Sequence, residues 1–560
     1  MLFKRSIDLF KKARVPLAIL LLFASFVVYT FSSVNRIQKA NASPYQATIE
    51  DYPANEPYGE AKGIFPGRVV WYWNPDATNE SSTMTVNGDG IVDNNDDVYY
   101  LPKNNNEAVI DDMFDKVMLR LTGATSVASA WDSVFRYHNR TANQIDSGYS
   151  ADEKIYIKTN NQGIGLTFPM NQDLSQKDYT VWGKFPIHMT ATSPYSILAT
   201  LKHLVNEAGI PQENIYIGDP HNNFNNIYYN IIRDAFANVH IIGVNQNAVV
   251  DCEAYGRTLS VKGTTDEVFY SEKGVLIDGG SDKFYQQLID ADYIINIAAF
   301  KSHIRGGISL FCKSHFGSHT RDGASHLHPG LVAPEGGTPD NAGYGKYRVL
   351  TDLMGHENLG GKRIISILDG LWGGPPHELY EPRKWDMAPF NGDWTSSIFV
   401  SLDPVAISSV AHDFLRTEYS IADWGNEAYP NILGVDDYLH QAADDQFWPE
   451  GITYDLENDG APIGSLGTHE HWNNDTEMLY SRNLDSISGK GIQLVRIHSV
   501  PSVGLESSPV LSDEFTIYPN PASHTANLKI DNNYSGNVEI GVFSMNGQEV
   551  AKNSFKKVTR

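Results

Sequence analysis

The sequence predicts an α/β fold: a doubly wound, mainly parallel sheet with flanking helices, followed by a small C-terminal β-module. Short apolar runs rich in β-branched residues alternate with stretches of helical periodicity, which is typical of parallel strands joined by helices. The run 293–300 is apolar except for Asn296, as expected of a strand buried on both faces. A proline-containing linker at 501–511 precedes short alternating runs, which predict the β-module.

The expected elements follow the same alternation along the chain. The pattern predicts strands at 67–73, 154–160, 214–220, 239–244, 293–300, 364–369 and 398–403. Helical periodicity covers 106–138 with a break at Gly123, and then 195–208, 225–236, 346–357 and 405–417. The length allows one large domain with appendages or two to four ordinary domains, and residues 67–500 are interpreted as one α/β domain.

Composition limits the kinds of function that this chain can have. The 560 residues carry a formal net charge of −24, which argues against a nucleic-acid partner. The two cysteines, Cys252 and Cys312, lie in different segments without a Cys-x-x-Cys pair. Neither an iron–sulfur cluster nor a disulfide framework is therefore expected.

The amino terminus has the pattern of a secretory signal. Basic residues precede an uncharged apolar run at 15–31, and Ala40-Asn41-Ala42 offers a cleavage site of small residues. Residues 1–42 are interpreted as a signal peptide or an uncleaved signal anchor, and 43–66 as a polar leader. Membrane contact is expected only through this segment, if it is uncleaved. Either way, the folded part is exported.

Polar and basic residues gather where the strand at 293–300 ends. Five of the 18 histidines lie between positions 303 and 328. Ligands in open α/β sheets bind beyond the carboxyl ends of strands, and imidazole is a common ligand of transition metals. The candidate metal ligands are His315, His319, His326 and His328, with His469 and His471 from a later segment. The alternative is that individual histidines are ordinary surface or hydrogen-bonded residues.

The segment 467–473 places Glu470 between two histidines. In extended backbone, His469 and His471 point the same way and Glu470 points the opposite way. One of these histidines can join the cluster at 303–328, and the others can act as hydrogen-bond partners.

The same region predicts binding of a small anionic substrate. Lys301, His303 and Lys313 are the candidate catalytic residues, with lysines neutralising a carboxylate or phosphate and a histidine transferring a proton. The candidate substrate-binding residues are Lys158, Asn160, Arg305, Asp369 and Asp403. Asp369 and Asp403 each end a predicted strand, where aspartate is also a common helix cap or turn former.

A loop at 87–96 resembles calcium loops of the EF-hand or dockerin type. Asn87, Asp89, Asp93 and Asp96 would supply oxygen ligands at positions three, five, nine and twelve. Thr85 stands at the first position and Asp96 replaces the usual glutamate, so an acidic, turn-rich insert is the alternative to a Ca²⁺ site.

Several short motifs resemble those of domain-of-unknown-function family 362, over roughly residues 67–496. They are Lys158-Thr-Asn160, Ile295-Asn-Ile297, Lys301-Ser-His303, Lys313-Ser-His-Phe-Gly317, Leu368-Asp-Gly370 and Ser401-Leu-Asp-Pro-Val-Ala406. Thr159 and Ser314 depart from the usual Pro and Asn of these motifs. The resemblance implies a domain whose activity is not established.

A fainter resemblance links the same region to the nickel-pincer lactate racemase family. His303, Gly306-Gly307 and Lys313 show that family's spacing. It implies that Lys313 is an anchor and that one of His319, His326 or His328 is a metal ligand.

The C-terminal residues 512–560 resemble the sorting domain of type IX secretion cargo. The motif runs from Asp513 to Ala522 and is followed by alternating runs at 526–530 and 538–543. The pattern stops at Arg560, before the closing strands expected of such a domain. The resemblance implies recognition by secretion machinery and a location in the periplasm, at the cell surface or outside the cell.

Three functional interpretations stay open at this point. The first is a metal-dependent enzyme that acts on a small anionic substrate. The second is a non-catalytic cell-surface protein that binds an anion or a metal. The third is a structural cluster that joins loops. Reaction type, substrate and metal are not determined by the sequence.

Overall fold

The computed structural model describes residues 54–86, 92, 95–161, 188–245, 251–264, 267–273, 282–332, 344–376, 380–420 and 434–498, and four strands between 515 and 557. The predicted signal segment lies outside the described residues. The chain divides between Ser499 and Val500 into two compact units. Among the described residues, no helix is both long and apolar enough to span a bilayer.

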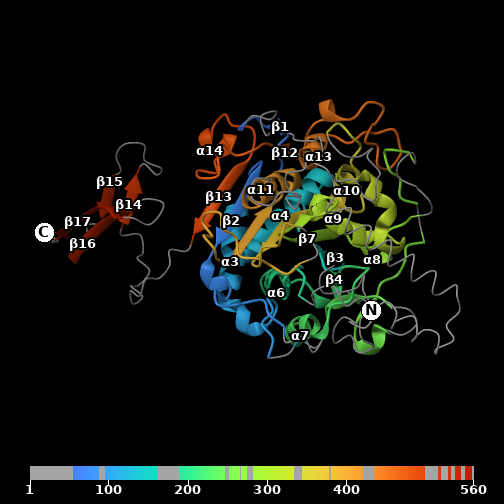
Figure 1. Ribbon diagram of the computed structural model, residues 1–560, viewed down its shortest axis with the longest axis horizontal. Helices are drawn as coiled ribbons and strands as arrows, with labels where there is room; N and C mark the ends of the chain where they lie inside the picture. The colour runs from blue at the N-terminus through green and yellow to red at the C-terminus, as the bar shows by residue number, and fades with distance from the viewer. Residues whose placement is uncertain are drawn as a thin grey trace, which may run out of the picture. The chain divides into compact units, whose positions relative to one another are not determined.

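The first unit is built on a nine-stranded sheet (Figure 1). The strand order is β13 (Gln493–His498), β2 (Arg68–Trp73), β11 (Ser397–Ser401), β10 (Arg363–Gly370), β7 (Tyr293–Ala299), β3 (Ile155–Thr159), β4 (Ile215–Gly218), β5 (His240–Gly243) and β6 (Thr258–Leu259). Every neighbouring pair is parallel except those made by β11, which runs antiparallel to β2 and β10. The predicted α/β class with a mainly parallel sheet is confirmed.

Side chains from the two faces of the sheet enter two large cores, because neighbouring residues of a strand point in opposite directions, and Tyr156, Ile242 and Leu288 belong to a third, smaller cluster. Val70 and Tyr72 pack on one face and Val69 and Trp71 on the other. The first core contains residues of α3 (Glu107–Thr122), α4 (Val127–Ala142), α6 (Pro194–Leu201) and α7 (Asn226–Ala235). The second contains residues of α9 (Phe311–Ser314), α10 (Val349–Gly355), α11 (Pro404–Glu418) and α13 (Gly434–Ala443). The result is a three-layer arrangement.

Local chemistry explains where several helices begin and end. Gly123 adopts φ 73° after α3, a left-handed conformation that glycine favours, and Ser126 caps α4 by accepting a hydrogen bond from Ser129 N. Helix α6 continues as a π-helix, Lys202–Glu207, and together they match the predicted helix at 195–208.

The reversed direction of β11 places the ends of β10 and β11 at opposite edges of the sheet. Asp369 of β10 lies opposite Ile398 of β11, and Ser366 lies opposite Ser401. Asp403 therefore follows β11 at the edge where the parallel strands begin. Its carboxylate accepts hydrogen bonds from Val405 N and Ala406 N and caps α11.

Smaller elements complete both units. In the first, β1 (Tyr58–Gly59) pairs with β12 (Thr468–His469), and β8 (Ser302–His303) pairs with β9 (Gly307–Ile308). Two short helices are α8 (Gln286–Ile289) and α14 (Ser481–Leu484). The second unit contains two antiparallel pairs, β14 (Phe515–Tyr518) with β15 (Asn527–Ile530), and β16 (Gly536–Phe543) with β17 (Glu549–Lys557).

Candidate metal centre

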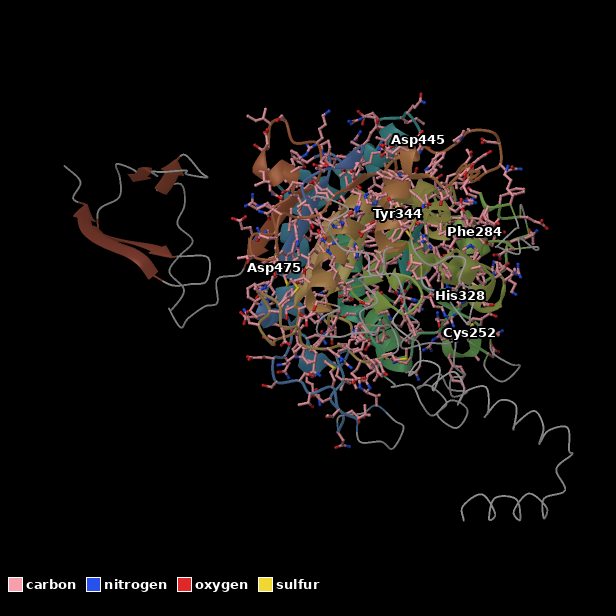
Figure 2. The ribbon with its side chains drawn as sticks, turned by 45° about the horizontal axis from the view of Figure 1, so that its top comes forward. Cys252, Phe284, His328, Tyr344, Asp445 and Asp475 are labelled. Atoms are coloured by element: carbon pink, nitrogen blue, oxygen red, sulfur yellow. The ribbon has the colours of Figure 1, made fainter. Side chains whose placement is uncertain are left out.

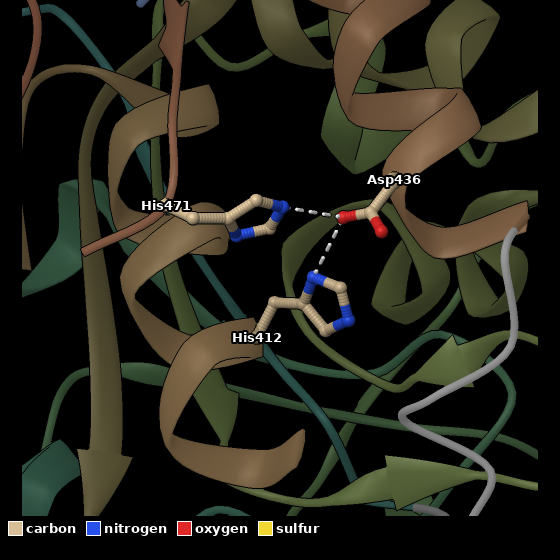
Figure 3. A group of neighbouring side chains, drawn as sticks. All are labelled: His412, Asp436 and His471. Atoms are coloured by element: carbon tan, nitrogen blue, oxygen red, sulfur yellow. Dashed lines mark ion pairs between the residues drawn. The ribbon is translucent and has the colours of Figure 1, made fainter. Parts of the chain in front are cut away.

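Three segments that are distant in the sequence bring imidazoles around one carboxylate. His412 belongs to α11, Asp436 to α13, and His471 follows β12. Figure 3 shows both rings directed at the same oxygen of Asp436. Oδ1 of Asp436 lies 3.3 Å from Nδ1 of His412 and 3.1 Å from Nε2 of His471. Nε2 of His469 lies 3.8 Å from the same oxygen.

Asp403 holds two of these segments together. Besides capping α11, its carboxylate accepts a hydrogen bond from Thr468 N at 3.2 Å, at the start of β12. Ser409 of α11 lies 2.8 Å from Nδ1 of His469. Capping and strand placement thus fix the distance between α11 and the histidine-bearing segment.

Extended backbone explains how His469 and His471 face the same centre. Their ring centroids lie 5.0 Å apart. The carboxylate of Glu470, between them, accepts hydrogen bonds from Ser481 Oγ and Ile492 N instead. The side chains of extended backbone alternate between two sides, so the sequence predicts this arrangement of His469, Glu470 and His471.

A second carboxylate orients His471. Nδ1 of His471 lies 2.7 Å from Oδ1 of Asp413, and the same carboxylate accepts hydrogen bonds from Tyr480 Oη and Trp472 N. Arg416 Nε lies 3.1 Å from Asp413 Oδ1. With Nδ1–H directed at Asp413, the Nε2 of His471 faces Asp436, as in the carboxylate–histidine pairs that orient metal ligands.

The charges of this cluster are set by competition between burial and neighbouring groups. Burial opposes ionisation of Asp436, but His471 and His412 outweigh it and keep the pKa of Asp436 well below its usual value. Burial and Arg416 lower the pKa of His471, but Asp413 and Asp436 outweigh them and raise it to about 9. Burial, reinforced by His440 and His471, keeps the pKa of His469 well below its usual value. At neutral pH the cluster thus contains an ionised Asp436, a protonated His471 that pairs with it and a neutral His469, and a metal ion at Asp436 would replace the proton on His471 Nε2.

The donor atoms fit a metal ion. His412, Asp436 and His471 offer atoms that all lie within 4.8 Å of one another. Tetrahedral ligands at about 2.1 Å from an ion are about 3.4 Å apart, close to the separations found here. Within the described part of the chain, His469 Nε2 is buried and lacks a hydrogen-bond partner, whereas Asp436 Oδ1 faces the ring nitrogens of His412 and His471. A cation bound at this point would give His469 Nε2 a partner.

His440 lies beside the cluster on the same helix as Asp436. Its Nδ1 lies 2.8 Å from the carbonyl oxygen of Asp436, and its ring meets that of His469 edge-on at 4.4 Å. Tyr344, labelled in Figure 2, packs against the His440 ring with centroids 5.9 Å apart. His440 therefore supports the placement of Asp436 and His469.

The histidines of the segment 303–328 have other partners. His315 contacts Asn296 and Ser318, and His319 Nδ1 lies 2.9 Å from the His315 carbonyl oxygen. His326 Nε2 lies 2.7 Å from Asp282, and His328, labelled in Figure 2, lies 2.8 Å from Arg305. The structure groups His469 and His471 with His412 and Asp436, two residues that the sequence analysis did not single out.

The predicted catalytic residues lie in a strongly basic environment. Lys301 is completely buried and donates to the carbonyl oxygen of Thr190. His303 Nδ1 accepts hydrogen bonds from the backbone N–H groups of Arg305 and Gly306. Burial, with Lys313 as the largest neighbouring charge, keeps the pKa of His303 well below its usual value. Lys313 Nζ lies 3.9 Å from the centre of the Phe316 ring.

The predicted substrate-binding residues are also engaged with protein groups. Lys158 is completely buried, donates to the Thr159 carbonyl and lies 3.6 Å from Asp219. Asn160 donates to Ser309 Oγ at 3.0 Å. Asp369 accepts hydrogen bonds from Ser193 N and Leu371 N, and burial raises its pKa to about 6. Burial likewise raises the pKa of Asp403 to about 6.

Most of the predicted calcium loop falls outside the residues that the structure describes. Asn87, Asp89 and Asp93 lie outside the described residues, whereas Asp96 is buried and its carbonyl oxygen accepts a hydrogen bond from Lys103. The Ca²⁺ site stays a prediction.

Spacing offers one signal for the residues that the sequence analysis missed. Asp436 and His440 are four residues apart on a helix and thus on one face, as are Ser409 and Asp413. Nothing in the spacing connects these helices to the segment 469–471, since that contact is made only in the folded chain.

Two segments of the chain match models of known families. Residues 182–413 match the family described as domain of unknown function (DUF362), and residues 516–560 match a secretion system C-terminal sorting domain. The first match is narrower than the resemblance at 67–496 and contains His412 but not the other three donors. The sorting domain directs export to the cell surface or the extracellular space. No match was found among curated proteins or among solved structures.

Proposed function

We propose that this protein, which its C-terminal sorting domain directs out of the cell, is a metalloprotein. The ligands of one divalent transition-metal ion are His412, Asp436 and His471, with His469 as a further donor. The observation that carries this proposal is the convergence of buried donor atoms on Asp436 Oδ1 from three separate segments.

The donor set favours a particular class of metal. Imidazole suits Zn²⁺, Fe²⁺, Ni²⁺ and Cu²⁺, whereas Mg²⁺ and Ca²⁺ prefer oxygen ligands. Two histidines and one carboxylate occur in catalytic zinc sites and in non-haem iron sites. We expect Zn²⁺ or Fe²⁺ in the exported protein.

We further propose that the centre is catalytic. A divalent ion in this position supplies Lewis acidity to a bound oxygen ligand. In this arrangement His412, Asp436 and His471 bind the ion, whereas His469 does not bind it, so that its buried neutral imidazole, oriented by Ser409, lies beside the metal as a weak base. Asp413 fixes the ring of His471. The anionic substrate predicted from the lysines near His303 remains part of this proposal.

One observation favours a second candidate function, that of a non-catalytic metal-binding protein. The side chains of His412, His469 and His471 are 2%, 1% and 4% exposed, and that of Asp436 is 13% exposed. Four protein donors in a buried setting are typical of structural metal sites, whereas catalytic sites keep a position open.

The metal content of the purified full chain, without a histidine tag or chelator, tests the proposal. We expect about one equivalent of metal in the wild type and loss of that metal in His412→Ala and His471→Ala. Glu470→Gln is a matched control because Glu470 lies between two of the donors but faces away. A well-folded wild type that takes up no zinc, iron or nickel would refute the metalloprotein proposal.

His469→Ala separates the two candidate functions. In a structural site, loss of a donor lowers both metal affinity and melting temperature. In a catalytic site where His469 handles a proton, the variant keeps its metal and loses turnover. Screening wild type and variant against carboxylate and phosphate esters supplies the activity readout.

A further inference from the structure

A pocket separate from the metal cluster lies beside β6, at the end of the sheet. Its volume is about 500 Å³, and it is lined by Lys262, Gly263, Lys283, Thr320, Arg321, Ser325 and His326. These residues come from the segment after β6, the segment before α8, and the 3₁₀ helix Asp322–Gly330 with the residues that precede it.

The lining is cationic in a strongly acidic protein. Lys262, Lys283 and Arg321 contribute three positive charges, and no residue lining the pocket within the described ranges is acidic. The whole chain, in contrast, carries a net charge of −24. A concentration of positive charge in a pocket attracts anions locally, although the negative net charge of the whole protein repels them.

One buried carboxylate organises the wall of the pocket. Asp282 accepts hydrogen bonds from Lys283 N at 2.9 Å and Arg321 N at 3.3 Å, and it lies 2.7 Å from His326 Nε2. Although burial opposes it, the contact with His326 keeps the pKa of Asp282 below its usual value. With the three cations counted against this one anion, the net charge of these four groups is +2.

Backbone pairing holds the lining residues in place. Thr320 N donates to the Lys283 carbonyl at 2.7 Å, and Lys283 N lies 3.2 Å from Thr320 Oγ1. Gly263 N donates to the Phe284 carbonyl, and a Cβ at Gly263 would lie 2.4 Å from that oxygen. Lys283 Nζ donates to the Thr264 carbonyl. The cationic side chains therefore extend from backbone segments that these hydrogen bonds already hold in place, so little ordering is needed when a ligand binds.

We propose that this pocket binds the phosphate or sulfate group of a small organic monoester. A guanidinium and two ammonium groups match a doubly charged tetrahedral oxyanion. The volume lies within the range of about 300–1,000 Å³ that is typical of small-molecule sites and exceeds the needs of a bare oxyanion. The organic part of the ester occupies the remaining space.

Calorimetric titration of the full chain tests this site with four probes: glucose 6-phosphate, glucose 6-sulfate, inorganic phosphate and glucose. We expect saturable binding of at least one ester, weaker binding of inorganic phosphate at the same site, and no binding of glucose. Arg321→Gln and the Lys262→Gln/Lys283→Gln pair should each weaken ester binding at least tenfold. Lys262 is exposed, so Lys262→Gln alone tests the site without risk to folding.

Lys116→Gln, on the distant helix α3, removes the same charge outside the pocket and should leave binding unchanged. Asp436→Asn should also leave it unchanged, which separates this site from the proposed metal centre. Absence of saturable ester binding at millimolar concentration would overturn the proposal. Equal affinity for inorganic phosphate and the esters, or binding that resists both sets of pocket substitutions, would also overturn it.

Discussion

Two histidine-rich regions of this protein differ in what lies at their centre. Between His303 and His328, the imidazoles lie among lysines and Arg305, and several are held by backbone groups. Around Asp436, fewer histidines surround one ionised carboxylate. The first region is suited to anions and the second to a cation. Histidine density in the sequence therefore did not lead to the proposed metal centre, which is defined by a carboxylate that lies between histidines.

Buried aspartates show how strongly the partners of a carboxylate set its charge. Asp352 accepts hydrogen bonds from Ser271 and Tyr347, and burial raises its pKa to about 7. Asp282, in contrast, lies 2.7 Å from His326 Nε2 in the first region, and its pKa is held below the usual value. Asp436 is also buried, but neighbouring imidazoles stabilise its charged form. Burial alone favours the neutral acid, and a cationic partner or hydrogen bonds donated to the carboxylate reverse that preference.

The largest expected effect tests the contrast between the two regions directly. Asp436→Asn removes the charge shared by the histidines, and we expect metal affinity to fall by about a thousandfold or more, roughly 4 kcal/mol. Competition titration with a chelator measures this change. The double variant His319→Ala/His326→Ala should retain full metal content. If the double variant loses the metal and Asp436→Asn retains it, the metal binds in the region between His303 and His328 and not at Asp436.

The second prediction concerns the pH dependence of stability. Because the pKa of Asp352 is raised to about 7 in the folded state, the folded chain binds an extra proton between about pH 4 and pH 7. The contribution of Asp352 to the free energy of unfolding therefore falls as pH rises through this window, by up to about 4 kcal/mol. Asp352→Asn keeps the hydrogen-bond acceptor and should remove this slope.

Urea unfolding of wild type and Asp352→Asn at pH 5 and pH 8 measures the difference. We expect the variant to gain stability relative to wild type at pH 8. Parallel pH profiles for the two proteins would show that Asp352 does not titrate in this range.

A smaller effect, on the free energy of unfolding, is expected when the buried ion pair between Lys158 and Asp219 is broken. Asp219→Asn leaves the ammonium of Lys158 buried without its anionic partner, and we expect a loss of about 3 kcal/mol in the free energy of unfolding. The double variant Lys158→Met/Asp219→Asn should recover part of this loss. Chemical denaturation of the wild type, Asp219→Asn, Lys158→Met and the double variant is the measurement. If the loss in the double variant equals the sum of the two single losses, the pair is not coupled.

The smallest predicted effect tests the orientation of His471. Asp413→Asn keeps an acceptor near His471 Nδ1 but removes the charge, and metal affinity should fall by about 10- to 100-fold. Since Asp413 also binds Tyr480 and Trp472, melting temperatures of the metal-free proteins must be compared. An unchanged metal affinity would exclude an orienting role for Asp413.

Local patterns predicted much of the fold. The break at Gly123, the helix that begins after Asp403 and the buried strand at 293–300 follow from backbone freedom, capping and apolar periodicity. The reversed direction of β11 did not follow, because strand direction depends on partners far along the chain. As a result, Asp369 and Asp403 lie at opposite edges of the sheet although both end predicted strands.

The sequence by itself determined the mainly parallel α/β class, the secretion sorting domain and the shared orientation of His469 and His471. These features depend on composition, on motifs or on the two-residue period of extended backbone. Only the tertiary structure decided that these histidines face His412 and Asp436, and that Lys262 and Arg321 line one pocket. Both sites join residues separated by tens of positions, and such contacts arise from the packing of helices and loops around the sheet, which no local pattern encodes.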